Sequence, residues 1–113
     1  MLELFADGAE YRVDPFTEPL AGLNAIREHW NGVAATQDHI EFDAERVWVS
    51  GRTVLGNWHV VLTRRASADR VRIRGFSIME LDDRGLITRM KEWPVERVVG
   101  IDSSYRKRAE AGE

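Results

Sequence analysis

The feature that most constrains the fold of this chain is a change of hydrophobic period near Asp38. Before this point, apolar residues recur at the three- and four-residue spacing of a helix. After it, apolar and polar residues alternate in segments rich in Val, Ile, Trp and Phe, as in half-buried strands. The change of period predicts four long strands, at residues 39–50, 52–65, 70–82 and 86–98.

Short polar turns separate these segments, which fixes how the strands are expected to pair. The turns are Ser50-Gly51, Ala68-Asp69 and Asp83-Arg84-Gly85. Consecutive strands joined by such turns form an antiparallel meander. Because the strands are longer than average, the sheet should twist and curl strongly.

One helix is predicted at residues 22–36, with an apolar stripe formed by Leu23, Ile26, Trp30, Val33 and Ala34. Upstream, residues 2–6 resemble the last turn of a helix that Gly8 would end, residues 9–13 a short strand, and residues 14–21 a loop. The prediction is an α+β fold in which the helix packs on the concave face of the curled sheet.

Composition sets the class of protein and excludes several functions. A length of 113 residues suits one domain, assigned to residues 1–100, with a polar tail at 101–113. A net charge of −3 argues against a nucleic-acid partner, and no apolar run is long enough to span a membrane. The chain has no cysteine and no signal-type N-terminus, so a cytoplasmic location is expected.

Four segments together resemble a known superfamily. They are residues 4–9, Asp14-Pro15-Phe16, residues 22–30, and residues 77–93 with the sequence SIMELDDRGLITRMKEW. The chain resembles the nuclear transport factor 2-like superfamily over residues 2–98, and most closely its SnoaL-like and ketosteroid-isomerase-like branches. The resemblance implies a cone-shaped fold, in which a curved sheet surrounds an apolar cavity.

The resemblance carries two further expectations about the whole molecule. Members commonly form homodimers through the outer face of the sheet. Most also begin with one or two helices that close the cone, and these are largely missing here. The expectation is that the tail or a partner subunit covers the opening, or that the chain is a fragment or starts from the wrong codon.

The same resemblance suggests three catalytic residues. Asp14 aligns with the proton-shuttling base of the ketosteroid isomerase branch, where a partly desolvated carboxylate is required. Alternatively, Asp14 simply caps its own turn. Ser77 falls where that branch carries an oxyanion donor; alternatively, it is a small residue that leaves space on a strand facing the pocket. Glu92 falls where the limonene-epoxide-hydrolase branch carries a catalytic aspartate.

Epoxide hydrolysis itself is disfavoured, because that branch uses an Asp–Arg–Asp relay. The two other relay positions align with Trp58 and Val60, which are apolar. Glu92 would then be either a buried acid or an exposed strand residue beside Lys91.

A set of aromatic and apolar residues is the candidate lining of a ligand cavity, with plain hydrophobic core as the alternative for each member. The set comprises Tyr11, Phe16, Trp30, Phe42, Trp58, Val60, Met79, Met90 and Trp93.

Neither the histidines nor the arginines favour another site. His29, His39 and His59 are too far apart for a local metal motif, so no metal is expected. The basic cluster near one hairpin is interpreted as an outer or dimer-facing surface rather than an anion site. Its members are Arg64, Arg65, Arg70, Arg72 and Arg74.

Two functions remain open from the sequence. The first is a cofactor-independent isomerase, cyclase or dehydratase that acts on a small hydrophobic carbonyl compound. The second is a non-catalytic module with the same fold that binds a ligand or dimerises.

Overall fold

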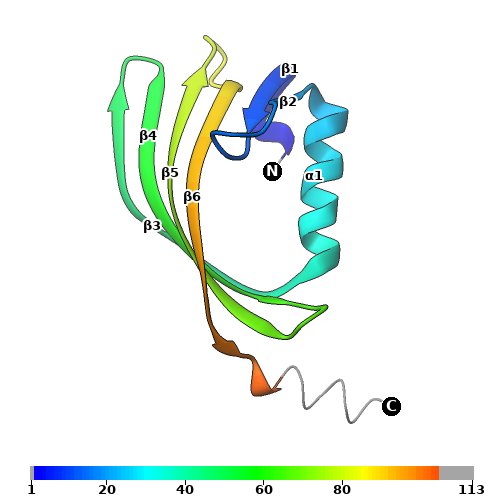
Figure 1. Cartoon of the computed structure of the whole chain (residues 1–113). Coiled ribbons are helices and arrows are strands. Elements are labelled where there is room, and N and C mark those ends of the chain that lie inside the picture. The colour runs from blue at the N-terminus through cyan, green and yellow to red at the C-terminus, as the bar shows by residue number, and fades with distance from the viewer. Residues whose placement is uncertain (1, 105–113) are drawn as a thin grey trace.

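The computed structural model describes residues 2–104 (Figure 1). This part of the chain contains one α-helix, one short 3-10 helix and six strands, which confirms the α+β class. In chain order the elements are η1 (Leu2–Leu4), β1 (Phe5–Arg12), β2 (Leu20–Ala21), α1 (Leu23–Thr36), β3 (Gln37–Ser50), β4 (Thr53–Arg64), β5 (Asp69–Leu81) and β6 (Ile87–Ile101).

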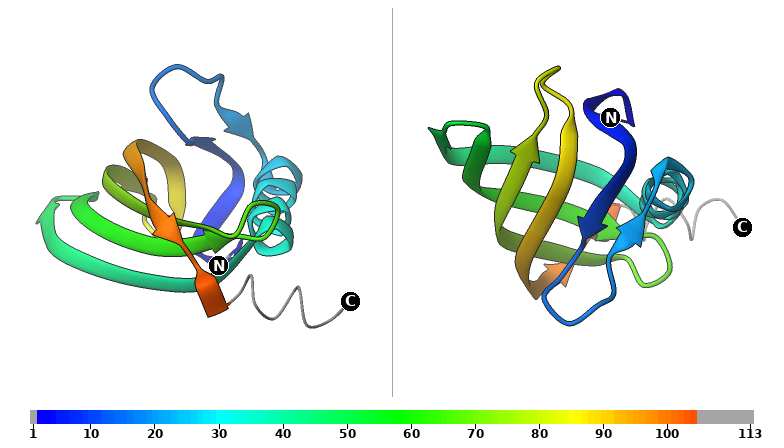
Figure 2. Two further views of the ribbon diagram at one scale, coloured as in Figure 1. Left: turned by 60° about the horizontal axis from the view of Figure 1, so that its bottom comes forward. Right: turned by 90° about the horizontal axis from the view of Figure 1, so that it is seen from above.

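The strands form a single curved sheet in the order β2-β1-β6-β5-β4-β3. Strands β3 to β6 pair consecutively and antiparallel, as expected when short turns join period-two segments. The sheet curls strongly, and α1 lies across one end of its concave side (Figures 1 and 2).

The N-terminal region differs from the prediction. Instead of a helix end followed by one short strand, a single 3-10 turn leads into β1, and β2 adds a second short strand. Gly8 does adopt the left-handed conformation expected of it, with φ 73°, but it lies within β1 rather than after a helix. Because β1 pairs parallel with β6, the sheet is mixed rather than purely antiparallel.

Helix α1 connects the N-terminal strands to the long strands of the sheet. Gly22 precedes it with φ 87°, a conformation that favours glycine, and the Gly22 N–H donates to the carbonyl of Ala9 at 2.9 Å. The apolar stripe of α1 then packs on β1, with Ile26 fully buried. The buried core comprises Phe5, Ala9, Tyr11, Ile26 and Ile87.

The turn between β5 and β6 illustrates how local chemistry sets the meander. The carboxylate of Asp82 accepts hydrogen bonds from the backbone N–H groups of Arg84 and Leu86, both at 2.9 Å. Gly85 has φ 80°. These contacts satisfy the turn's own backbone donors and reverse the chain.

The boundary of the predicted tail also differs. Ile101 is the last residue of β6, and Asp102 is attached to the sheet. Its backbone N–H donates to Ala68 at 2.8 Å, and its carboxylate accepts the hydroxyl of the fully buried Thr63 at 2.7 Å. The rest of the predicted tail, from residue 105 onward, lies outside the described residues.

Candidate functional site

Four side chains from four different strands form a hydrogen-bonded chain, here called the Glu92 cluster. The hydroxyl of Tyr11 on β1 donates to Glu92 Oε1 on β6. The hydroxyl of Ser77 on β5 donates to Glu92 Oε2 at 2.8 Å. The indole N–H of Trp58 on β4 donates to the Ser77 oxygen at 2.7 Å. The cluster therefore crosses the middle of the sheet.

Strand register brings these residues to one face. Ser77 is directly opposite Glu92, and Met79 is opposite Met90. In the parallel ladder, Tyr11 is the partner of Met90. Because successive side chains on a strand point to opposite faces, Glu92 and Ser77 share the face that packs on α1.

A glycine makes room for the Trp58 indole. Gly75 is the cross-strand partner of Trp58, and a Cβ atom added at Gly75 would lie 2.2 Å from that ring. The indole therefore lies flat across the backbone of β5, in the orientation that brings its N–H to Ser77. Phe42 of β3 stacks on the same indole, with ring centroids 6.4 Å apart.

Burial dominates the electrostatics of the cluster. Glu92 is half-buried, and removal from water raises the pKa of its carboxyl above the usual 4.5, while the hydrogen bonds from Tyr11 and Ser77 act in the opposite direction. Burial also raises the pKa of Tyr11, and the neighbouring Glu92 charge and the hydrogen bond to it add to the effect. Tyr11 thus remains a neutral hydrogen-bond donor, and Glu92 keeps its proton to a higher pH than an exposed glutamate does.

Helix α1 contributes two rings to the surroundings of Tyr11. The Trp30 ring stacks on Tyr11 with centroids 5.8 Å apart, and the His29 ring meets Tyr11 edge to face at 5.6 Å. Burial lowers the pKa of His29, so the imidazole stays neutral at neutral pH. The surroundings of the Tyr11–Glu92 hydrogen bond therefore consist of neutral aromatic rings rather than cations.

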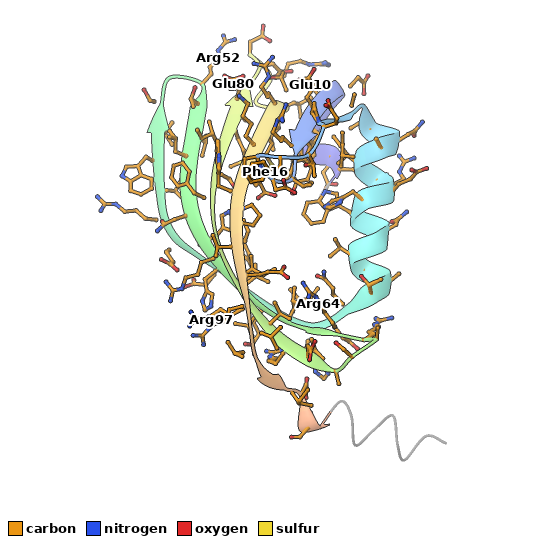
Figure 3. The ribbon with its side chains drawn as sticks, viewed as in Figure 1. Glu10, Phe16, Arg52, Arg64, Glu80 and Arg97 are labelled. Carbon is orange, nitrogen blue, oxygen red and sulfur yellow. The ribbon has the colours of Figure 1, made fainter. Side chains whose placement is uncertain are left out.

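The structure does not bring Asp14 into the Glu92 cluster. Its carboxylate accepts the backbone N–H groups of Phe16 at 2.8 Å and Thr17 at 3.1 Å, which is the alternative of a turn-capping residue. Phe16 is in the same loop between β1 and β2 (Figure 3), and 96% of its surface is exposed. Neither residue contributes to an apolar wall in this structure.

Trp93 also lies away from the cluster, because it follows Glu92 on a strand and points to the opposite, outer face. There its ring packs against that of Phe76, with ring centroids 6.3 Å apart, and the Phe76 ring packs against that of Trp48, with centroids 6.4 Å apart. This outer aromatic row remains partly open, with Trp48 41% and Trp93 39% exposed.

The other predicted lining residues lie on the concave face. Val60 is two residues from Trp58 on β4 and pairs with Phe42 of β3. Met79 and Met90 pair with each other and pack against the core around Tyr11. They form an apolar floor beside the cluster.

Two surface hollows are present in the described part of the chain. One, of about 200 Å³, is lined by Pro19 and by residues of β1 and β6, among them Met90 of the apolar floor. The other, of about 440 Å³, is lined by His39, Arg70 and Asp102 among others. Neither hollow is lined by Tyr11, Trp58, Ser77 or Glu92, so these side chains do not form the wall of either one.

Four of the five clustered arginines are neutralised by acids. The ion pairs are Arg64 with Glu96 at 2.6 Å, Arg65 with Asp38 at 3.8 Å, Arg70 with Glu41 at 3.4 Å, and Arg74 with Glu45 at 3.5 Å. Within residues 2–104, no three His, Asp or Glu side chains are grouped as metal ligands require. No helix in this part of the chain is long and apolar enough to cross a membrane.

Sequence reasoning missed His29 and Gly75. His29 is three positions after the buried Ile26 and beside Trp30, which places it at the edge of the apolar stripe. Gly75 carries no such local signal, because the ring that requires it comes from another strand.

Comparisons with known proteins agree with this architecture. A family model described as a SnoaL-like domain matches residues 1–90. No curated protein matches the chain in sequence.

Three solved structures illustrate the similarity. A protein from Jannaschia sp. CCS1, named as a SnoaL-like polyketide cyclase, has 15% identity and a TM-score of 0.74, with 81% of this chain and 67% of that chain covered. SalBIII, an epoxide hydrolase/cyclase-like enzyme of pyran ring formation in the polyether salinomycin, has 18% identity and a TM-score of 0.76, with 86% and 79% covered. An NTF2-like protein from Burkholderia thailandensis E264 has 17% identity and a TM-score of 0.73, with 100% and 82% covered. At such identities the similarity establishes an NTF2-like fold.

Proposed function

Because the chain belongs to the SnoaL-like domain family, we propose that it is a cofactor-independent isomerase or cyclase for a small hydrophobic carbonyl compound. The ligand binds on the concave face between α1 and the middle of the sheet. Glu92 is the group that takes and returns the proton. Two similar structures, one named as a polyketide cyclase and the other as an epoxide hydrolase/cyclase-like enzyme, support this reaction class.

The observation that carries the proposal is the state of Glu92. Its carboxyl group is half-buried, its pKa is raised by burial, and both oxygens are held by hydroxyl groups. A proton carrier works best when its pKa lies close to the pH at which it acts. A fixed, partly desolvated carboxyl group meets this requirement, and apolar side chains surround it.

The chemistry needs only the proton that Glu92 moves. The carboxylate removes a proton from the carbon next to a carbonyl, and the C–H electron pair becomes an enolate. Where a double bond lies beside the enolate, return of the proton from Glu92 to the far carbon of the dienolate isomerises the compound. In ring closure, the enolate attacks a second carbonyl carbon, and the alkoxide that forms takes the proton from Glu92. In dehydration, a β-hydroxyl group leaves with that proton as water.

This proposal gives Asp14 no part in the proton transfer. Its carboxylate is used by the turn that contains Phe16 and Thr17. Ser77 acts by holding Glu92 rather than as an oxyanion donor, since its hydroxyl hydrogen is donated to that carboxylate.

The second candidate is a binding module without catalysis. Both oxygens of Glu92 already accept hydrogen bonds from the protein, and a network of this kind can also serve only to fix side chains. On this alternative, the same concave face holds an apolar ligand that is not changed.

We also propose a homodimer formed through the outer face of the sheet. The outer aromatic row of Trp48, Phe76 and Trp93 supports it, because contiguous exposed apolar surface of this kind favours a partner. Arg46 lies over the Trp48 ring at 5.0 Å and would border the interface.

Deuterium exchange into 1-tetralone tests the proposed proton transfer. This bicyclic ketone is apolar and has exchangeable hydrogens next to its carbonyl. In D₂O, the wild-type protein should accelerate their replacement by deuterium, as followed by proton NMR. The variant Glu92→Gln should lose about 100-fold or more of this acceleration.

The matched control is Glu96→Gln, on the same strand, where the acid is exposed and paired with Arg64. It should exchange at the wild-type rate. An unchanged rate in Glu92→Gln would exclude Glu92 as the base. Binding of the ketone without any acceleration would favour the non-catalytic module.

A further inference from the structure

The indole N–H of Trp30 is a buried donor without an acceptor among residues 2–104. Tryptophan Nε1–H can only donate a hydrogen bond, so it is satisfied only by an acceptor atom. Buried polar groups in native structures are nearly always paired, because an unpaired one keeps its desolvation penalty. The unmet N–H of Trp30 therefore requires a physical explanation.

The position of Trp30 relates this donor to the Glu92 cluster. Its ring stacks on Tyr11, at an interplanar angle of 22°, and the hydroxyl of Tyr11 donates to Glu92. The ring of Tyr11 thus lies between the Trp30 indole and the Glu92 carboxyl group. Asn57 Oδ1 and His59 Nε2 are also buried without partners, but strand alternation places them on the outer face, away from Trp58.

The charges around Trp30 restrict which acceptor would fit. Glu92 is nearby, and the rings in contact are those of Tyr11 and His29, of which His29 is kept neutral by a pKa that burial lowers. No cation belongs to this group of side chains. A carboxylate or phosphate would meet no compensating charge and would be repelled by ionised Glu92.

We infer that Trp30 Nε1–H donates a hydrogen bond to an uncharged oxygen of the ligand, which is an apolar compound with a ketone, ester or ether group. This assignment rests on the proposed function and narrows its substrate class. The oxygen is held at Trp30 while the adjacent carbon faces Glu92. Since the N–H is covered by its neighbours, ligand binding requires a turn of the indole that uncovers it.

A pair of probes that differ in one oxygen tests this inference. 1-Tetralone carries a carbonyl where tetralin, its hydrocarbon counterpart, carries a CH₂ group. The chain has four tryptophans, so its ¹⁵N–¹H spectrum contains four indole signals. The Trp30 signal should move downfield with 1-tetralone but not with tetralin, while that of Trp48 on the outer face should stay in place.

Affinity measurements on Trp30→Phe provide a second readout. This variant keeps an aromatic ring against Tyr11 but removes the donor together with part of the indole, a loss of ring that the control variant Trp48→Phe shares. Wild type should bind 1-tetralone about tenfold more tightly than tetralin, and the preference should disappear in Trp30→Phe. The control Trp48→Phe should keep it. Should Trp30→Phe fail to fold, the indole signal of the wild-type protein still decides the question.

The outcomes separate this inference from the proposed function. An unmoved Trp30 signal, or an equal ketone preference in Trp30→Phe and wild type, overturns the donor role even if Glu92 still catalyses exchange. A lost preference without catalysed exchange keeps the donor role and removes the enzyme. If wild type binds neither probe, or both equally, the inference is contradicted.

Discussion

At the scale of single residues, Glu92 is the position where folding and chemistry oppose each other. Two hydroxyl groups hydrogen-bond to its carboxyl group inside the protein, but burial disfavours the charged form of that group. Hydrogen bonds from Tyr11 and Ser77 recover part of that loss. Because of the remaining penalty, Glu92 keeps a proton at a pH where an exposed glutamate would have lost it, which suits the proposed proton transfer.

Glu92→Gln should make stability less sensitive to pH. Below pH 4.5, Glu92 is protonated in both the folded and the unfolded chain, so the two proteins should melt at similar temperatures. As pH rises from 4.5 through the raised pKa of the folded state, the unfolded chain ionises first and the wild type loses stability. Thermal melts from pH 4 to 8 should therefore show a Tm advantage of Glu92→Gln that grows with pH and then levels off.

Glu96→Gln is the matched comparison, since Glu96 is exposed and its ion pair lies at the surface. Its Tm difference from wild type should remain small over the same range. An advantage of Glu92→Gln that shrinks as the pH rises would mean that the folded state favours the charged carboxylate.

At the scale of elements, the packing of β4 on β5 holds the cluster in place. Trp58 can lie across Gly75 because that position has no side chain, and this orientation directs its N–H to Ser77. The hydroxyl of Ser77 is then left with its hydrogen directed at Glu92. A change at Gly75 should thus affect the acid without touching it.

Gly75→Ala should lower the free energy of unfolding by about 1–3 kcal/mol, because the new methyl group and the indole cannot occupy the same space. Chemical denaturation measures this loss. Gly100→Ala, in β6, is the control: an added Cβ there meets no atom within 4 Å, so the change should stay within about 0.5 kcal/mol. Equal effects of the two substitutions would indicate that the Trp58 ring moves aside freely.

The elements themselves differ in how far the sequence predicts them. Strands β3 to β6 and helix α1 follow from hydrophobic period and turn residues, which are local signals. The parallel pairing of β1 with β6 joins segments about 80 residues apart and leaves no such signal. For the same reason a helix end was expected where η1 and β1 form.

The site was predicted only in part, because local sequence signals identify single residues but not the long-range contacts between them. Ser77 and Glu92 were both named, but their direct contact depends on strand register, which a pattern alone does not define. Trp93 could have been excluded, because alternation sends it to the face opposite Glu92. The exposure of Phe16 could not be predicted, since a loop aromatic has no period that indicates its direction.

At the scale of the whole molecule, the described chain is elongated and incompletely covered. Its radius of gyration is 16.0 Å, against about 13 Å for a compact chain of this length. Apolar side chains along the long strands remain open to solvent, among them Trp48 and Trp93 of the outer aromatic row. A second copy would cover that row.

The protein should therefore sediment at twice the mass of one chain. Trp93→Lys should shift it to the mass of one chain, because a charge in the middle of an apolar interface is costly to bury. Phe16→Lys replaces an exposed aromatic residue outside the outer aromatic row and should leave the dimer intact. Sedimentation of the wild type at the mass of one chain would contradict the dimer.

The pH dependence of deuterium exchange into 1-tetralone tests the central claim most directly. The wild-type rate should rise with pH through a midpoint above 4.5, as Glu92 loses its proton, and Tyr11→Phe should move that midpoint higher by removing a hydrogen bond that favours the charged form. A midpoint at or below 4.5, or an unaltered profile in Glu92→Gln, would contradict the account.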